Sequence, residues 1–222
     1  MHPPALLLHA VMLLFLLSAG VTHGVEPAAK LLPVDEAAKN PSFFIFRARL
    51  QEALAKHDVA HLLSVTDPKI QIGFGGDDGI EAFKKDWKLN APNSSELWST
   101  LGRALALGGK FMEEGDFQAP YVCAAWPEKY DAFDYVAIVG ENVRLRAQAS
   151  ATSAVVASLS FDVVHLVESS AQSGKDTWTK VRLMDGREGY VSDAFLGRAV
   201  GYRAYFSKKD GSWKMTAFLA GD

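Results

Sequence analysis

The sequence predicts an α+β N-terminal domain followed by a small all-β domain, with a last β-hairpin that we expect to complete the first domain. Apolar residues recur at helical spacing from Phe43 to Leu54, which predicts an amphipathic helix. Apolar and polar residues alternate on both sides of Asp185-Gly186, and again around Asp210-Gly211. Such alternation is typical of a β-hairpin, because an Asp-Gly pair supplies the positive φ that a tight two-residue turn requires.

The composition is that of an ordinary globular protein. The chain has 222 residues, of which 49% are hydrophobic and 22% charged, and its net charge is −3. A chain of this size can bury a real core in one or two domains. Nucleic-acid binding would need a clustered basic face, and the short lysine runs lie among acidic neighbours. We therefore expect no nucleic-acid partner.

Residues 1–24 have the pattern of a secretory signal peptide. The stretch from Ala5 to Gly20 is almost wholly apolar but short for a membrane span, and small residues near its end offer cleavage sites. The segment has no Lys or Arg, so an uncleaved anchor is the alternative. We expect a mature protein that is periplasmic or secreted rather than integral to a membrane. Residues 25–40 are expected to form a linker or a loosely attached arm.

Residues 41–130 form the predicted α+β domain. We expect Ser42 to cap the first helix, and Asn93 with Glu96 to cap a later helix over 97–105. Between them the pattern predicts a short helix over 59–63 that stops at Asp67-Pro68, a strand over 70–74 and a helix over 80–87; residues 117–125 are expected to be extended. This order resembles the opening of the nuclear transport factor 2-like folds, which finish in a curved antiparallel sheet.

Residues 134–197 form the predicted all-β domain. The segment WTKVRLMDGREGYV, from Trp178 to Val191, resembles the closing hairpin of bacterial SH3-like domains. Upstream, Val143-Arg144-Leu145-Arg146, then Ser150, Ser153 and the run from Val155 to Leu159, follow the order of that family. The family's Gly-Pro is Gln148-Ala149 here and its Asn is Arg144, so the first long loop departs from the family pattern. The resemblance implies a small SH3-like β-barrel.

The same resemblance implies a binding module. SH3-like modules are appended to cell-wall enzymes and to many exported proteins, so the expected partner is peptidoglycan or an envelope protein. Trp178 and Tyr190 are candidate ligand-binding residues, because aromatic side chains at a barrel rim can line a groove for a peptide or glycan. Core packing is the alternative for Trp178. Arg146 is the candidate partner for a carboxylate of a wall peptide, and pairing with Asp185 or Glu188 is its alternative.

Residues 201–220 contain the last predicted hairpin, which lies beyond the usual end of an SH3-like domain. The N-terminal region has too few evident strands to cover its own helices. We therefore expect this hairpin to join the sheet of the α+β domain, beside the strand near 70–74 or 118–125. The all-β domain would then be an insertion.

No catalytic residue, metal ligand or cofactor site is assigned from the sequence. His57 and His61 are spaced to share a helix face as a metal pair, but no third ligand is evident nearby, so histidines at a helix boundary are expected. Cys123, the only cysteine, lies in an apolar run predicted to be extended, which favours a buried structural thiol. The run from Gly73 to Gly79 matches neither a phosphate loop nor a calcium loop and is expected to be a turn.

These observations favour an exported, non-catalytic binding or adaptor protein of the bacterial envelope, whose SH3-like module recognises peptidoglycan peptides or a protein partner. The alternative is a hydrolase or other small-molecule enzyme with its site in the N-terminal domain. That alternative needs a deep polar pocket in which His57, His61 or Cys123 meets carboxylates.

Overall fold

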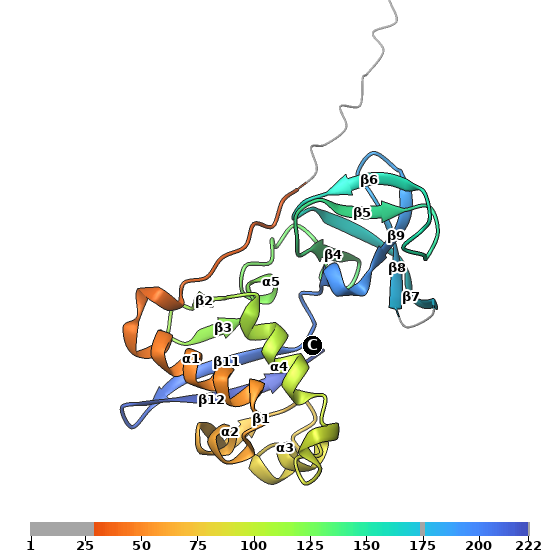
Figure 1. Cartoon of the computed structure of the whole chain (residues 1–222). Helices are drawn as coiled ribbons and strands as arrows, with labels where there is room; N and C mark the ends of the chain where they lie inside the picture. The colour runs from red at the N-terminus through yellow and green to blue at the C-terminus, as the bar shows by residue number, and fades with distance from the viewer. Residues whose placement is uncertain (1–28, 174–175, 222) are drawn as a thin grey trace, which may run out of the picture.

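The protein has two lobes, each built on its own β-sheet (Figure 1). The computed structural model describes residues 29–173 and 176–221, so the expected signal peptide at 1–24 lies outside the described residues. We call residues 37–119 and 203–219 the helix-sheet lobe, and residues 135–197 the all-β lobe. The mixed α+β class is confirmed. Over the described ranges, no helix is long and apolar enough to cross a membrane.

The helices belong to the helix-sheet lobe and to the junction between the lobes, apart from the last short one. They are η1 (Ala37–Lys39), α1 (Pro41–Ala55), α2 (Val59–Ser64), α3 (Ile80–Asp86), η2 (Pro92–Ser94), α4 (Leu97–Ala106), α5 (Tyr121–Ala124) and η3 (Asp193–Phe195).

The strands fall into two groups. The helix-sheet lobe contains β1 (Thr66–Gln71), β2 (Lys110–Phe111), β3 (Phe117–Ala119), β11 (Arg203–Lys209) and β12 (Ser212–Leu219). The all-β lobe contains β4 (Tyr135–Ile138), β5 (Val143–Arg146), β6 (Val155–Leu159), β7 (Val163–Ser173), β8 (Asp176–Arg182), β9 (Glu188–Ser192) and β10 (Leu196–Gly197).

The last hairpin completes the sheet of the helix-sheet lobe, as predicted. The strand order is β1-β12-β11-β3-β2, so β12 and β11 lie between β1 on one side and β3 with β2 on the other. β12 runs parallel to β1, and β11 runs antiparallel to β3. Asp210 and Gly211 both have positive φ between the paired residues Lys209 and Ser212, so the turn has two residues. The all-β lobe is therefore an insertion between β3 and β11.

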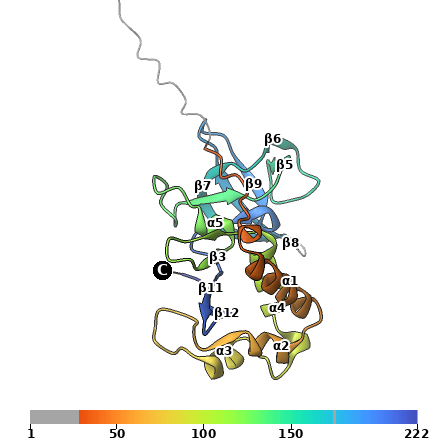
Figure 2. The same ribbon diagram turned by 90° about the vertical axis from the view of Figure 1, so that its left-hand side faces the viewer.

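Helices α1 and α4 lie on one side of this sheet (Figure 2). Phe43 of α1 is fully buried, and its ring centroid lies 4.3 Å from that of Phe117 on β3 and 4.9 Å from that of Trp213 on β12. The apolar residues whose spacing predicted the helix form the face of α1 that packs on the sheet. The helix begins at Pro41 rather than after Ser42, because Asn40 is the N-cap and its side chain accepts a hydrogen bond from the backbone N–H of Phe43.

Other predicted boundaries in this lobe were wrong by several residues. Asn93 does not cap a helix, since it lies in η2 and α4 begins at Leu97. The helix expected over 59–63 is present as α2 and ends at Ser64, but the strand expected over 70–74 begins at Thr66. Asp67-Pro68 therefore lies inside β1, an edge strand in which a missing N–H can be tolerated. The extended run expected over 117–125 ends at Ala119, after which the chain turns into α5.

The all-β lobe is a seven-stranded sheet in the order β10-β4-β7-β8-β9-β5-β6. The predicted hairpin is present as β8 and β9, which pair from Trp178–Ser192 to Arg182–Glu188. Its turn is one residue longer than expected, because the N–H of Leu183 donates to the carbonyl of Arg187 across Met184, Asp185 and Gly186. Within the ranges described, the strand pairing stays open from β10 to β6 and does not close into a barrel.

The residues just before α1 are docked on both lobes, which differs from the loosely attached arm expected over 25–40. The Lys30 ammonium lies 2.7 Å from the Asp162 carboxylate of the all-β lobe, and Leu31 is 5% exposed. Further along, the N–H of Glu36 donates to the carbonyl of Gly109 in the helix-sheet lobe. The arm therefore connects the two lobes by hydrogen bonds as well as by the chain.

Candidate ligand-binding groove

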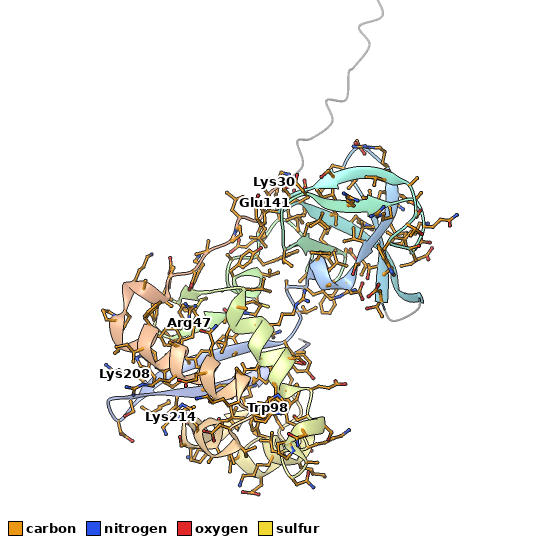
Figure 3. All side chains as sticks on the ribbon, in the orientation of Figure 1. Lys30, Arg47, Trp98, Glu141, Lys208 and Lys214 are labelled. Atoms are coloured by element: carbon orange, nitrogen blue, oxygen red, sulfur yellow. The ribbon has the colours of Figure 1, made fainter. Side chains whose placement is uncertain are left out.

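A groove of about 510 Å³ lies on the all-β lobe. Its lining residues come from four segments that are separate in the sequence: the turn before β5, β5 with the loop after it, the start of β8, and the end of β9 with η3. They are Glu141, Asn142, Val143, Arg144, Arg146, Ala151, Asp176, Trp178, Ser192, Ala194 and Phe195. Glu141 is labelled at the edge of the all-β lobe in Figure 3.

Strand register explains why several of these side chains share one face. Arg146 on β5 is the register partner of Tyr190 on β9, which in turn lies opposite Lys180 on β8. Residues directly opposite one another project to the same side of a sheet, and residues two apart in a strand do the same. Trp178 and Ser192 therefore share this face, whereas Val181 and Val191 point to the other face and form the core of the lobe.

Trp178 forms the floor of the groove and Phe195 its exposed rim. Trp178 lines the groove yet is only 5% exposed, and it does not belong to the core cluster that contains Val181. Phe195 lies in η3 and is 48% exposed. An aromatic floor with an exposed aromatic rim offers apolar contact to a ligand at small cost in side-chain entropy. The burial of Trp178 agrees with the core packing that was its alternative, and the same side chain also lines the groove.

Arg146 also lines the groove, and its local partner is a carbonyl rather than a carboxylate. Its Nη1 donates to the carbonyl oxygen of Ser153 at 2.7 Å, which holds the loop after β5. The expected alternative, an ion pair with Asp185 or Glu188, is wrong: the carboxylate of Asp185 pairs with Arg187, and that of Glu188 pairs with Lys180 and Arg182. A guanidinium has five N–H donors, so one bond to Ser153 leaves others for a ligand.

The groove carries charges of both signs. Arg144 is two residues from Arg146 on β5, so their guanidinium groups lie on the same face. Glu141 and Asp176 contribute carboxylates and are exposed. Guanidinium groups bind carboxylates through paired hydrogen bonds, and carboxylates bind ammonium groups. The lining therefore suits a ligand that carries both a carboxylate and an amine.

Tyr190 lies next to the groove rather than among its lining residues. It is half-buried and sits between Arg146 and Lys180 in the strand register. Lys180 is engaged by Glu188, whose hydrogen bond raises the pKa of the ammonium, and hydrogen bonds from Arg182 and Lys180 lower the pKa of the Glu188 carboxyl. Lys180, Arg182 and Glu188 therefore form a row of paired charges on the same face as Tyr190.

The two candidate histidines do not form a helical metal pair. His57 lies after α1 with φ of 53°, and its ring stacks on Trp98 at 4.9 Å, so it does not share a helix with His61 of α2. In the part of the chain that the structure describes, no three or more His, Cys, Asp or Glu residues could hold a metal ion. The described residues that line the shallow depression around His57 include no carboxylate.

Cys123 lies on the short helix α5 rather than in an extended run. Its Sγ is 3.6 Å from the carbonyl oxygen of Arg198. Burial raises the pKa of the Cys123 thiol from 9.0 to about 12, against a smaller opposing effect of the Arg203 charge. The thiolate is the nucleophilic form of cysteine, so this environment suppresses reactivity.

The run from Gly73 to Gly79 is a turn, in which Asp78 accepts a hydrogen bond from the N–H of Ile72.

Arg144, Phe195, Glu141 and Asp176 were missed as site residues by sequence reasoning. Arg144 had a usable signal, because two arginines at positions i and i+2 of a strand share one face. Phe195 had none, since an apolar residue after a strand is equally typical of a core.

No protein-family model matches the chain, and neither does any curated protein or solved structure.

Proposed function

We propose that the protein is an exported, non-catalytic binding protein of the bacterial envelope, and that its all-β lobe is an SH3-like module which recognises peptidoglycan peptides. The apolar stretch from Ala5 to Gly20 supports export, and the match of the hairpin from Trp178 to Val191 to SH3-like domains supports the module. A periplasmic or secreted location follows from the same proposal.

The observation that carries this proposal is the groove that joins Trp178 and Phe195 to Arg144 and Arg146. Peptides of the bacterial wall carry carboxylates and amines on a short, extended chain. The arginines would bind a carboxylate, and Glu141 with Asp176 an amine. The aromatic floor and rim would contact the backbone and methyl groups between them.

Co-sedimentation with purified cell-wall sacculi tests the proposal. The protein would start at Val25, and the groove variants would be Phe195→Ala and Arg144→Ala. Both side chains are exposed, so their removal leaves the core unchanged. Trp178→Ala is less informative, because a side chain with 5% exposure also contributes to stability.

Matched controls exist outside the groove. Phe133 is 59% exposed before β4, and Arg49 is exposed on α1. We expect each groove variant to weaken wall binding about tenfold, which corresponds to the loss of one contact worth about 1 to 2 kcal/mol, and the control variants to bind as the wild type does. Absence of wall binding, or equal binding by groove and control variants, would contradict the proposal. Binding to an envelope protein but not to sacculi would assign the groove to a protein partner instead.

A further inference from the structure

A second cavity, of about 270 Å³, lies where the two lobes meet. One wall is α4 with Arg103 and Leu107, and another is the start of α5 with Val122. The third is the segment that returns from the all-β lobe to β11, including Leu196, Arg198 and Tyr202. In Figure 1 this segment descends from the all-β lobe past the end of α4. The cavity shares no residue with the groove on the all-β lobe.

Two arginines line this cavity, Arg103 from α4 and Arg198 from the segment that returns to β11. Arg103 is anchored: its Nη2 donates to the carbonyl oxygen of Leu196 at 2.9 Å and reaches that of Asp193 at 3.4 Å. The Nε and Nη1 donors of Arg103 remain available to a ligand. Within the described residues, the guanidinium of Arg198 makes no hydrogen bond or ion pair, while its backbone carbonyl accepts from Cys123 and Gly201. Arg198 therefore lines the cavity, and its guanidinium has no partner among the described residues.

A third guanidinium adds positive charge at the junction. Arg203 is 8% exposed, and no carboxylate of the described residues lies within ion-pair distance of it. It instead lies over the ring of Phe74, 5.7 Å from the ring centroid. A buried cation without a counter-ion is costly and raises the local potential for anions. The carboxylate among the cavity's lining, that of Asp193, already accepts the Thr179 hydroxyl at 2.6 Å.

The remaining wall is apolar, which narrows the class of ligand. Leu107, Val122 and Leu196 face the cavity, and Tyr202 stands at it with its ring 5.2 Å from Trp87. Cavities at the contact between lobes are common places for small ligands, and a few polar groups among apolar walls set the ligand's orientation. The volume admits a ligand about the size of one substituted ring.

We propose that this junction cavity binds a small organic anion. Its carboxylate or phosphate head would accept hydrogen bonds from Arg198 and Arg103, and its short apolar body would contact Leu107, Val122 and Leu196. Because these residues come from both lobes, the bound anion would link the lobes and stabilise their arrangement.

Titration of the isotopically labelled protein, residues 25–222, with four probes tests this proposal by NMR. Benzoate and phenyl phosphate each carry a ring and an anionic head, and their relative affinities distinguish a carboxylate from a phosphate site. Benzyl alcohol has the ring without the charge, and acetate has the charge without the ring. We expect at least one ring anion to shift the amides of residues 198–202 saturably, and to bind about tenfold or more tightly than benzyl alcohol and acetate.

Arg198→Gln is the decisive variant, because the side chain it changes has no structural bond to lose. We expect Arg198→Gln to weaken binding of the ring anion about tenfold. Arg144→Gln in the groove and Arg49→Gln on α1 should leave the affinity for that anion unchanged. The proposal is overturned if neither ring anion binds saturably, if benzyl alcohol binds equally well, or if Arg198→Gln has no effect. Shifts that Arg144→Gln abolishes would also overturn it, since they would place the anion in the groove.

Discussion

Thr66, in the first strand of the chain, is the register partner of Met215 in the last strand. Met215 is fully buried among residues of α1, β3 and β11, so the C-terminal hairpin belongs to the core of the lobe that the first helices begin. Along the sequence, most of the helix-sheet lobe comes first, the all-β lobe follows, and the last two strands belong to the helix-sheet lobe again. The helix-sheet lobe cannot be complete until its last residues are made.

Removal of residues 201–222 should therefore unfold the helix-sheet lobe. The deletion takes away two inner strands and the buried side chains of Phe206, Trp213, Met215 and Phe218. At about 1.5 to 3 kcal/mol for each, the loss of about 6 to 12 kcal/mol equals the whole stability of an ordinary domain. Near-ultraviolet circular dichroism and thermal unfolding measure the effect. A control that ends at Leu219 should unfold cooperatively, and a native spectrum from the shorter chain would contradict the insertion.

The pair Asp35–Arg47 should make stability depend on pH on the acid side. Arg47 donates to both carboxylate oxygens, at 2.7 and 2.8 Å, from α1 to the arm. Burial alone would raise the pKa of Asp35, but hydrogen bonds from Arg47 and Ala37 and the Arg47 charge hold that pKa below 3.8. A lowered folded pKa contributes stability that is present above the unfolded value and is lost as pH falls through the folded value.

Asp35→Asn should cost about 1 to 2 kcal/mol at pH 7, at the low side of a charged hydrogen bond because the Asp35 side chain is half exposed. The difference from the wild type should shrink as pH falls below 3.8. Urea denaturation across pH measures both effects. Asp185→Asn is the matched control, since the Asp185–Arg187 pair is on the surface. A penalty for Asp35→Asn that persists unchanged at low pH would show that the ion pair is not its cause.

Cys123 should resist alkylation in the folded protein. Cys123 is half-buried, and with the pKa of its thiol raised from 9.0 to about 12 its thiolate fraction at pH 8 is far smaller than that of an exposed cysteine. Because the folded pKa is the higher one, the contribution of this thiol to folding stability is fully present below pH 9.0 and is lost as pH rises toward 12. Iodoacetamide labelling with and without denaturant measures reactivity at this single cysteine. Equal rates in both states would contradict the burial.

Tyr121→Phe should be neutral or stabilising. Tyr121 is 1% exposed, and within the described part of the chain its hydroxyl has no hydrogen-bond partner, so desolvation raises its pKa. Removal of an unsatisfied buried hydroxyl relieves a penalty of about 1 to 3 kcal/mol, whereas Tyr121→Ala removes the ring as well and should cost about 3 to 5 kcal/mol. Thermal unfolding compares the two. A clear loss of stability in Tyr121→Phe would reveal a partner for the hydroxyl.

Local patterns were sufficient for the elements that local physics determines. Helical spacing identified the buried face of α1, and the two Asp-Gly pairs located both hairpins. Caps were less predictable, because Asn40 and Ser42 both have side chains suited to a helix N-cap, and Asn40 occupies that position. The end of β3 was missed, since an apolar run such as Tyr121 to Ala125 suits a short buried helix as well as a strand.

The sites depend on contacts between distant segments, which a single sequence does not reveal. Arg146 and Trp178 were identified through a family resemblance, but Phe195 joins them only because η3, which follows β9, lies against β8. Arg47 is buried on α1 and pairs with Asp35, which lies in a segment whose composition suggested a loose arm. The junction cavity needs three segments at once, so only the tertiary structure brings Arg103 and Arg198 together.

The most direct test of the proposed function is an NMR titration of the protein with a soluble wall stem peptide. The proposed function predicts saturable amide shifts confined to residues 141–146, 176–178 and 192–195, and an affinity that falls about tenfold in Phe195→Ala and in Arg144→Ala. Phe133→Ala should bind as the wild type does. Saturable binding that leaves these residues unshifted, or no binding at all, would show that the groove is not a site for wall peptides.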